Sequence, residues 1–164
     1  MSFFVWLEST PLSQWVVESL WAFPAILTFH AVGMGLAAGL SAMVDLRILG
    51  IGRGIPLPEL RRFLPVLWIG FWVNAISGVL LLVGYPTKAL TNPVFYLKLL
   101  FIAGGMTLLV RLTRRLFADD GASAVEKSPL VRRLAIVSLV CWAGAITAGR
   151  LLAYTYSHLT ATDF

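Results

Sequence analysis

The sequence predicts an all-α integral membrane protein: a four-helix bundle with both termini on the outer side and a short N-terminal interfacial helix. Its 164 residues are 59% hydrophobic and 13% charged, with a mean hydropathy of +0.85. Soluble domains are roughly 45–50% apolar and 25% charged, so this composition excludes an ordinary soluble domain. Four apolar stretches each approach the roughly 20 residues that cross a bilayer core. We therefore expect one transmembrane domain over residues 1–164, with spans at about 21–46, 62–84, 93–117 and 131–157.

A short helix is expected ahead of the first span. Thr10 followed by Pro11 is typical of an N-cap with proline at the first helical position, and it opens an amphipathic segment over Leu12–Leu20. Phe23-Pro24 then turns the chain into the membrane, because proline is tolerated in the first turn of a helix. Met1–Leu7 has no lysine or arginine before its apolar residues, so we expect it to belong to the mature chain rather than to a cleaved signal.

Three of the spans contain closely spaced small residues, which let transmembrane helices approach one another. They are Gly35 with Gly39 in the first span, Gly104 with Gly105 in the third, and Gly144 with Ala148 in the fourth. We expect these faces to pack within one chain. The alternative is that they join copies in a homo-oligomer or attach the chain to a larger membrane complex.

The basic residues indicate the orientation of the bundle. Ten of the 13 lie in or beside two linkers: Arg47, Arg53, Arg61 and Arg62 after the first span, and Arg111, Arg114, Arg115, Lys127, Arg132 and Arg133 around the polar linker Ala118–Ser128. The positive-inside rule then places both termini outside. The tyrosines Tyr85, Tyr96, Tyr154 and Tyr156 all fall at the outer interface, as in an aromatic belt. Because the basic residues flank apolar runs, the net charge of +5 indicates a membrane lipid environment and no nucleic-acid partner.

Three basic side chains are expected at one depth inside the membrane. Counting outward at 1.5 Å per residue, His30 lies about 22 Å, Lys98 about 20 Å and Arg150 about 24 Å from the inner boundary. The same depth on the second span reaches Ser77-Gly78. Ionisable residues within a membrane are expensive and by default mark a functional site. No Asp or Glu shares this layer, so an anionic ligand is the economical explanation.

A b-type haem fits these residue types. His30 would be the axial iron ligand, while Lys98 and Arg150 would hold the propionates. Gly33 and Gly78 would let the flat macrocycle approach closely, and Met34 would form part of an apolar wall. Tyr154 follows Arg150 at i+4 spacing, on a stripe that would line an outward-facing pocket. We expect His158, about 12 Å beyond Arg150, to be interfacial rather than a second ligand.

Each of these residues also has a purely structural interpretation. His30 would be a packed histidine that hydrogen-bonds a neighbouring backbone, Lys98 would extend to the outer headgroups, and Asn74 would be an interhelical hydrogen-bond partner. Asp45 is most simply ion-paired with Arg47 or Arg111 at the inner boundary. Cys141 is alone in the sequence, which excludes an internal disulfide, and we expect it to pack in the core.

Two stretches resemble motifs of small four-helix bacterial membrane haem proteins. They are Phe29-His30-Ala31-Val32-Gly33, on a helix that ends Asp45-Leu46-Arg47-Ile48-Leu49, and Tyr96-Leu97-Lys98-Leu99-Leu100-Phe101. They are similar to the first-helix FH motif and later-helix KL motif of HemJ-type protoporphyrinogen oxidases, and the first-helix histidine is similar to that of CopD-type copper-resistance proteins. The resemblance implies that His30 is the haem ligand, that Lys98 is a functional lysine and that the bacterial inner membrane is the location.

The leading functional hypothesis is an integral membrane cytochrome that holds one haem b near the outer face. It would exchange electrons with the quinone pool or a redox partner protein. A second hypothesis is a channel, carrier or sensor for a small anion, with His30, Lys98 and Arg150 as its site. A third is a structural subunit of a larger membrane complex.

Overall fold

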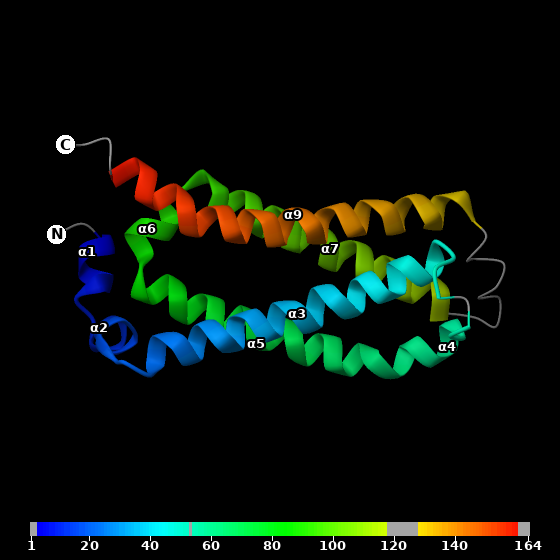
Figure 1. The fold of residues 1–164 in the computed structure, drawn as a ribbon, viewed down its shortest axis with the longest axis horizontal. Helices are drawn as coiled ribbons and strands as arrows, with labels where there is room; N and C mark the ends of the chain where they lie inside the picture. Colours follow the sequence, from blue (N-terminus) through cyan, green and yellow to red (C-terminus); the bar gives the residue numbers. More distant parts are fainter. Residues whose placement is uncertain (1–2, 53, 118–127, 161–164) are drawn as a thin grey trace.

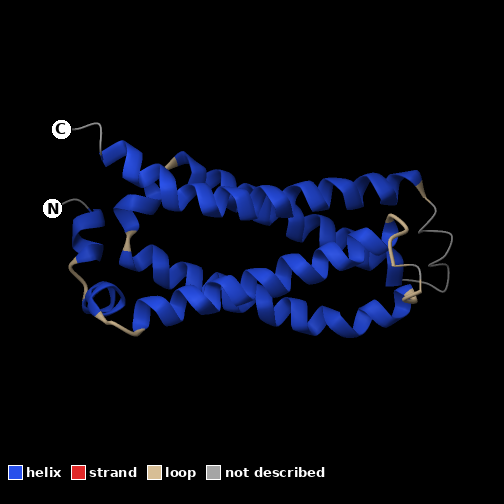
Figure 2. Cartoon of the chain, viewed as in Figure 1, coloured by secondary structure: helices blue, strands red, loops and turns tan. Residues whose placement is uncertain are grey.

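The computed structural model describes residues 3–52, 54–117 and 128–160, and these are helical throughout apart from turns (Figures 1 and 2). Four helices are long: α3 (Ala22–Ile48), α5 (Leu64–Gly84), α7 (Pro93–Phe117) and α9 (Pro129–Thr160). The short elements are α1 (Phe3–Glu8), α2 (Pro11–Glu18), α4 (Leu57–Leu60), the 3-10 turn η1 (Arg61–Phe63) and α6 (Pro86–Leu90). Of the predicted linker Ala118–Ser128, all but Ser128 lies outside the described residues.

The four long helices confirm the prediction of four helices able to span a membrane. Each is long and apolar enough to cross a bilayer, over Ala22–Ile48, Leu57–Gly84, Pro93–Phe117 and Pro129–Leu152. The second stretch begins five residues before the predicted 62, because α4 and η1 continue directly into α5. By the length and composition of these helices the chain is therefore a multi-pass membrane protein, and its described residues are helical apart from turns.

The long helices form two antiparallel hairpins (Figure 1). In one, α3 packs along α5, and in the other, α7 packs along α9; contacts between α3 and α9 join the two. Helices α1, α2 and α6 lie at one end of the bundle, together with the C-terminal end of α9, and α4 lies at the other. We refer to these as the α2 end and the α4 end.

The two helices of the first hairpin touch backbone to backbone where α3 crosses α5. A Cβ atom on Gly33 would lie 2.6 Å from the Asn74 amide nitrogen and 2.7 Å from the Gly70 carbonyl oxygen. A Cβ on Gly70 would lie 2.5 Å from the Leu36 Cβ. Only glycine fits at these two positions without moving a helix.

The second hairpin uses small residues in the same way. Gly104 lies against Cys141, Gly105 against the Trp142 indole, and Gly144 against the Phe101 ring. Ala148 is also buried. The prediction that these small residues pack within the chain is confirmed.

Gly35 and Gly39 behave differently, and the prediction of packing within one chain is wrong for them. A Cβ on either glycine would meet nothing within 4 Å. The reason is angular: successive helical residues are about 100° apart, so Gly35 points well away from Gly33, which faces α5. This face of α3 is open in the described structure.

The N-terminal segment lies across the α2 end of the first hairpin. As predicted, Thr10 caps α2: its side-chain oxygen accepts a hydrogen bond from the Ser13 amide, and Pro11 occupies the first helical position. Val16 of α2 is fully buried and lies against Gly84, where a Cβ would come within 2.9 Å of it. The segment is therefore anchored on α5 rather than lying free.

The far end of α3 closes with a Schellman motif. Gly50 has φ of 98°, and its amide donates to the Arg47 carbonyl oxygen, while the Ile51 amide donates to the Leu46 carbonyl oxygen. The positive φ favours glycine at this position.

One buried hydrogen bond links the two hairpins. The Trp142 Nε1 on α9 donates to the Ser41 Oγ on α3 over 2.7 Å, and both side chains are buried. We expect Ser41→Ala to lower the free energy of unfolding by about 1 kcal/mol, since it leaves a buried indole N–H unpaired. Reversible unfolding in detergent measures this. Thr107→Ala, which removes only an exposed bond to the Ala103 carbonyl in the same helix, is the control; an equal loss there would contradict the assignment.

Candidate functional site

His30 lies where α3 faces the middle of α5, and its ring is held by that helix. The Nδ1 atom is 3.0 Å from the Asn74 backbone carbonyl oxygen and 3.2 Å from the Ser77 Oγ. A carbonyl oxygen can only accept, so Nδ1 carries the hydrogen and donates it to Asn74. The state of Nε2 is then decided by the group that it faces.

Asn74 also donates a hydrogen bond from α5 back to α3. Its side-chain Nδ2 donates to the His30 backbone carbonyl oxygen over 2.8 Å, and Asn74 is itself buried. Ser77 donates its hydroxyl hydrogen to the Val73 carbonyl oxygen at 2.6 Å. The expectation that Asn74 hydrogen-bonds between helices is confirmed. Asn74 and Ser77 together fix both the position and the tautomer of the imidazole.

Lys98, on the second hairpin, lies beside the other ring nitrogen of His30. Its Nζ lies 3.2 Å from His30 Nε2. An ammonium group can only donate, so Lys98 is the donor and Nε2 the acceptor, and the ring is neutral with its lone pair on Nε2. The lysine stem runs beside Gly149 of α9, where a Cβ would be 3.7 Å from Lys98 Cε. The structure thus brings together His30 and Lys98, 68 residues apart, as equal depth in the membrane predicts.

The predicted glycines have roles other than those expected. A Cβ on Gly78 would lie 3.1 Å from His30 Cε1, so this glycine makes room for the imidazole itself. The open side of Gly33 is filled by the backbone of α5. Met34 is half-buried and packs against the apolar cluster that includes Leu67 and Trp142.

Arg150 and Tyr154 do not join the His30–Lys98 pair. Both side chains are exposed on α9, Tyr154 by 62%. Gly149 faces Lys98, and the next residue points about 100° away. Among the described residues no hydrogen bond or ion pair involves Arg150. The side chain of His158 lies outside the described part of the chain.

The site lies near the α2 end of the second hairpin. Asn92, just before α7, donates from Nδ2 to the Thr155 Oγ1 over 2.8 Å and so ties the start of α7 to α9. Lys98 is six residues beyond Asn92, and Arg150 is five residues before Thr155. At 1.5 Å per residue, Arg150 and Lys98 are therefore about 7.5 Å and about 9 Å inside this tie.

No carboxylate neutralises the pair within the described structure. Glu8 accepts a hydrogen bond from Thr87, and Glu59 pairs with Arg62 at the opposite end of the bundle. Asp45 is 15 residues from His30 along α3, about 22 Å. The described residues contain no cluster of three or more His, Cys, Asp or Glu side chains that would hold a metal ion unaided. A ligand held by His30 would thus rely on one protein donor and a neighbouring cation.

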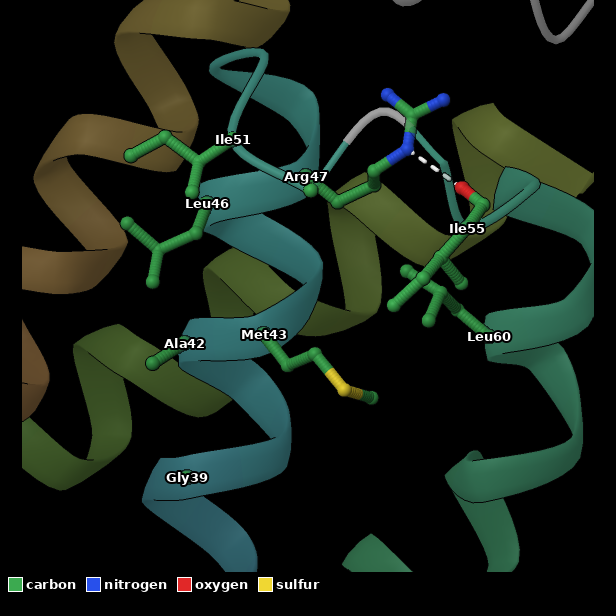
Figure 3. Close-up of a pocket in the computed structure, with 9 residues that line it drawn as sticks. Gly39, Ala42, Met43, Leu46, Arg47, Ile51, Ile55 and Leu60 are labelled. Carbon is green, nitrogen blue, oxygen red and sulfur yellow. Dashed lines mark hydrogen bonds between the residues drawn. The ribbon is translucent and has the colours of Figure 1, made fainter.

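Two shallow pockets lined by described residues lie away from this pair. One, of about 280 Å³, is at the α4 end and is lined mainly by apolar side chains between Gly39 and Leu60 (Figure 3). The other lies along α7 between Met106 and Arg114. Neither includes His30 or Lys98.

Sequence reasoning underestimated Asn74. Counting depth along the second span reaches Ser77, and Asn74 lies one helical turn before it, on the same face. This i, i+3 spacing indicates that Asn74, like Ser77, lies on the side of the second span that faces His30.

No known family model, characterised protein or solved structure matches this chain significantly. The likeness to HemJ-type and CopD-type proteins therefore stays a prediction based on the two short motifs.

Proposed function

We propose that this chain is a bacterial inner-membrane protein that binds one haem b through His30 and takes part in electron transfer or membrane redox chemistry. The observation that carries the proposal is the orientation of the imidazole. Metal-binding histidines typically donate one ring N–H to a carbonyl or carboxylate, which fixes the tautomer and directs the other nitrogen at the metal. His30 donates Nδ1–H to the Asn74 carbonyl oxygen and presents the Nε2 lone pair to the junction of the two hairpins.

Lys98 supplies the second element of the site. Its Nζ donates to Nε2, and a metal bound to Nε2 would take that lone pair and release the lysine. A released ammonium group without a carboxylate partner suits a propionate. Haem, when bound, supplies one-electron chemistry whose potential depends on the axial ligand and on burial.

The remaining residues have supporting tasks in this proposal. The Asn74 carbonyl and the Ser77 hydroxyl hold the ring, and Gly78 leaves space for it. Arg150, exposed near the α2 end, extends toward lipid headgroups or a second anionic substituent. Membrane quinone or a redox protein would then approach at this end.

The orientation proposed for the bundle follows from its arginines. Arg150 is the exception among the nine arginines in the described residues, and the other eight lie at the α4 end or the helix termini that flank it: Arg47, Arg61, Arg62, Arg111, Arg114, Arg115, Arg132 and Arg133. The positive-inside rule assigns that end to the cytoplasm. The His30–Lys98 pair then lies toward the outer face.

A second candidate is a small-anion site. The observation in its favour is that Lys98 has a neutral histidine as its hydrogen-bond partner, without an acidic one among the described residues. A cation in that setting attracts an anion. In this alternative the chain would be a carrier, channel or sensor.

Optical spectroscopy of the full chain distinguishes the two candidates. We expect protein produced with ample haem supply, or supplied with haemin after purification, to show b-type bands that change on dithionite reduction. His30→Ala should lose them and His158→Ala should keep them. A folded wild-type protein that stays colourless under both conditions would reject haem and leave the anion site, which chloride or formate binding to wild type and Lys98→Met then tests.

A further inference from the structure

Asp45 is a buried carboxyl group that the proposed haem site does not use. It lies in α3, three residues before the helix ends at Ile48, and its side chain is 0% exposed. Neither carboxylate oxygen has a hydrogen-bond partner. The sequence predicts an ion pair with Arg47 or Arg111 here, and that prediction is wrong: Asp45 is fully buried, whereas Arg111 is exposed on α7 and the Arg47 Nε donates to the Ile55 carbonyl oxygen.

The helix opposite Asp45 is α9. The Ser138 hydroxyl faces the carboxyl from there, and it is likewise 0% exposed and without a hydrogen bond. One turn nearer the α2 end on each helix, the Trp142 Nε1 donates to the Ser41 Oγ over 2.7 Å, so those two polar side chains are paired. Around Asp45 the interface is apolar, with Val44, Ile48, Leu112, Val131 and Ala135 in one cluster. Two unpaired polar side chains therefore meet within it.

No basic group faces this carboxyl from the described helices around it. On α3, Arg47 directs its Nε to the Ile55 carbonyl oxygen over 2.7 Å (Figure 3). In the turn that follows, Arg62 pairs with Glu59. The remaining guanidinium groups near this end are exposed, namely those of Arg61, Arg111, Arg114, Arg115, Arg132 and Arg133. Among the described residues, no cation would thus compensate the charge of an ionised Asp45.

We propose that Asp45 is a proton-binding site, whose carboxyl holds an exchangeable proton shared with the Ser138 hydroxyl. An unpaired carboxylate is strongly disfavoured among apolar side chains inside a membrane. A neutral carboxylic acid needs only an acceptor for its O–H and a donor for its carbonyl oxygen, and a serine hydroxyl serves as either. A small rotation of the two side chains brings them into hydrogen-bond geometry.

The proton exchanges with the α4 end. Asp45 is only three residues, about 5 Å along the axis, from the end of α3, whereas His30 is about 22 Å away. A metal cation in place of the proton would need several additional oxygen ligands. Leu112 and Ala135, which pack nearby, offer none from their side chains. This inference is independent of haem binding.

Infrared spectroscopy of the full chain in lipid nanodiscs tests the proposal. We expect the carbonyl band of a protonated carboxylic acid at neutral pH, and we expect it to shift in D₂O because the proton exchanges. The band should vanish in Asp45→Asn, persist in Glu59→Gln and move in Ser138→Ala, which removes its hydrogen-bond partner. Aspartate labelled with ¹³C at the carboxyl should also move the band, and this assigns it to an aspartate without a substitution.

Three outcomes would overturn the proposal. The first is a folded wild-type protein with no such band at neutral pH, because Asp45 would then be ionised. The second is a band that sodium ions remove at constant pH, which would assign the site to a metal cation. The third is a band that does not shift in D₂O, which would make the proton a fixed structural one.

Discussion

Replacing Gly33 by alanine is expected to lower the free energy of unfolding by about 2–3 kcal/mol, toward the upper end of typical overpacking costs. The added methyl group would come within 2.6 Å of the Asn74 amide nitrogen and 2.7 Å of the Gly70 carbonyl oxygen. Both are backbone atoms of α5, so relief requires the helices to move apart. Such a movement would also stretch the reciprocal bonds between His30 and Asn74. Reversible unfolding in detergent, together with the fraction of monodisperse protein, measures the loss.

Gly35→Ala is the matched control for this prediction. It makes the same change two residues farther along α3, where a Cβ meets nothing within 4 Å. Helix propensity alone then predicts a gain of up to about 1 kcal/mol. If the two variants lose stability equally, the close crossing of α3 and α5 at Gly33 is contradicted.

The sequence was sufficient to predict the four membrane helices and the N-cap at Thr10, because both depend on local composition. It did not predict which face of α3 packs against α5. A transmembrane helix is apolar on every side, so hydrophobic periodicity, which marks the buried face of a soluble helix, is absent. The GxxxG spacing of Gly35 and Gly39 was therefore misleading, whereas the isolated Gly33 makes the contact.

For the candidate site, too, the sequence predicted one property and not another. Residue counting at a fixed rise gives depth, and this predicted that His30, Ser77 and Lys98 share a layer. It does not give the direction in which a side chain points. Arg150 was expected beside the histidine, yet Gly149 faces Lys98 and Arg150 is exposed. One residue along α9 thus decides which side chain faces the histidine, and only the packed structure shows how the helix is rotated.

Replacing Lys98 by methionine is expected to stabilise the protein while removing its capacity to bind an anionic ligand. The change removes a half-buried charge from within a span, where lysine costs up to about 2.5–3.5 kcal/mol. It also removes one hydrogen bond to His30, worth about 1 kcal/mol. The net expectation is a gain of about 1–2 kcal/mol in the free energy of unfolding, since Lys98 lies only six residues into α7. Residues kept for function commonly carry such a cost to stability.

Lys88→Met is the matched control for Lys98→Met. Lys88 lies in α6 near the Tyr85 ring, outside the membrane-spanning helices. Its replacement should change stability little and leave ligand binding intact. If Lys98→Met instead destabilises the protein, the hydrogen bond from Nζ to His30 Nε2 acts mainly as a structural link between the two hairpins. Unfolding and ligand binding should be measured on wild type, Lys98→Met and Lys88→Met. If Lys98 serves function, its removal raises the free energy of unfolding; if it serves structure, its removal lowers it.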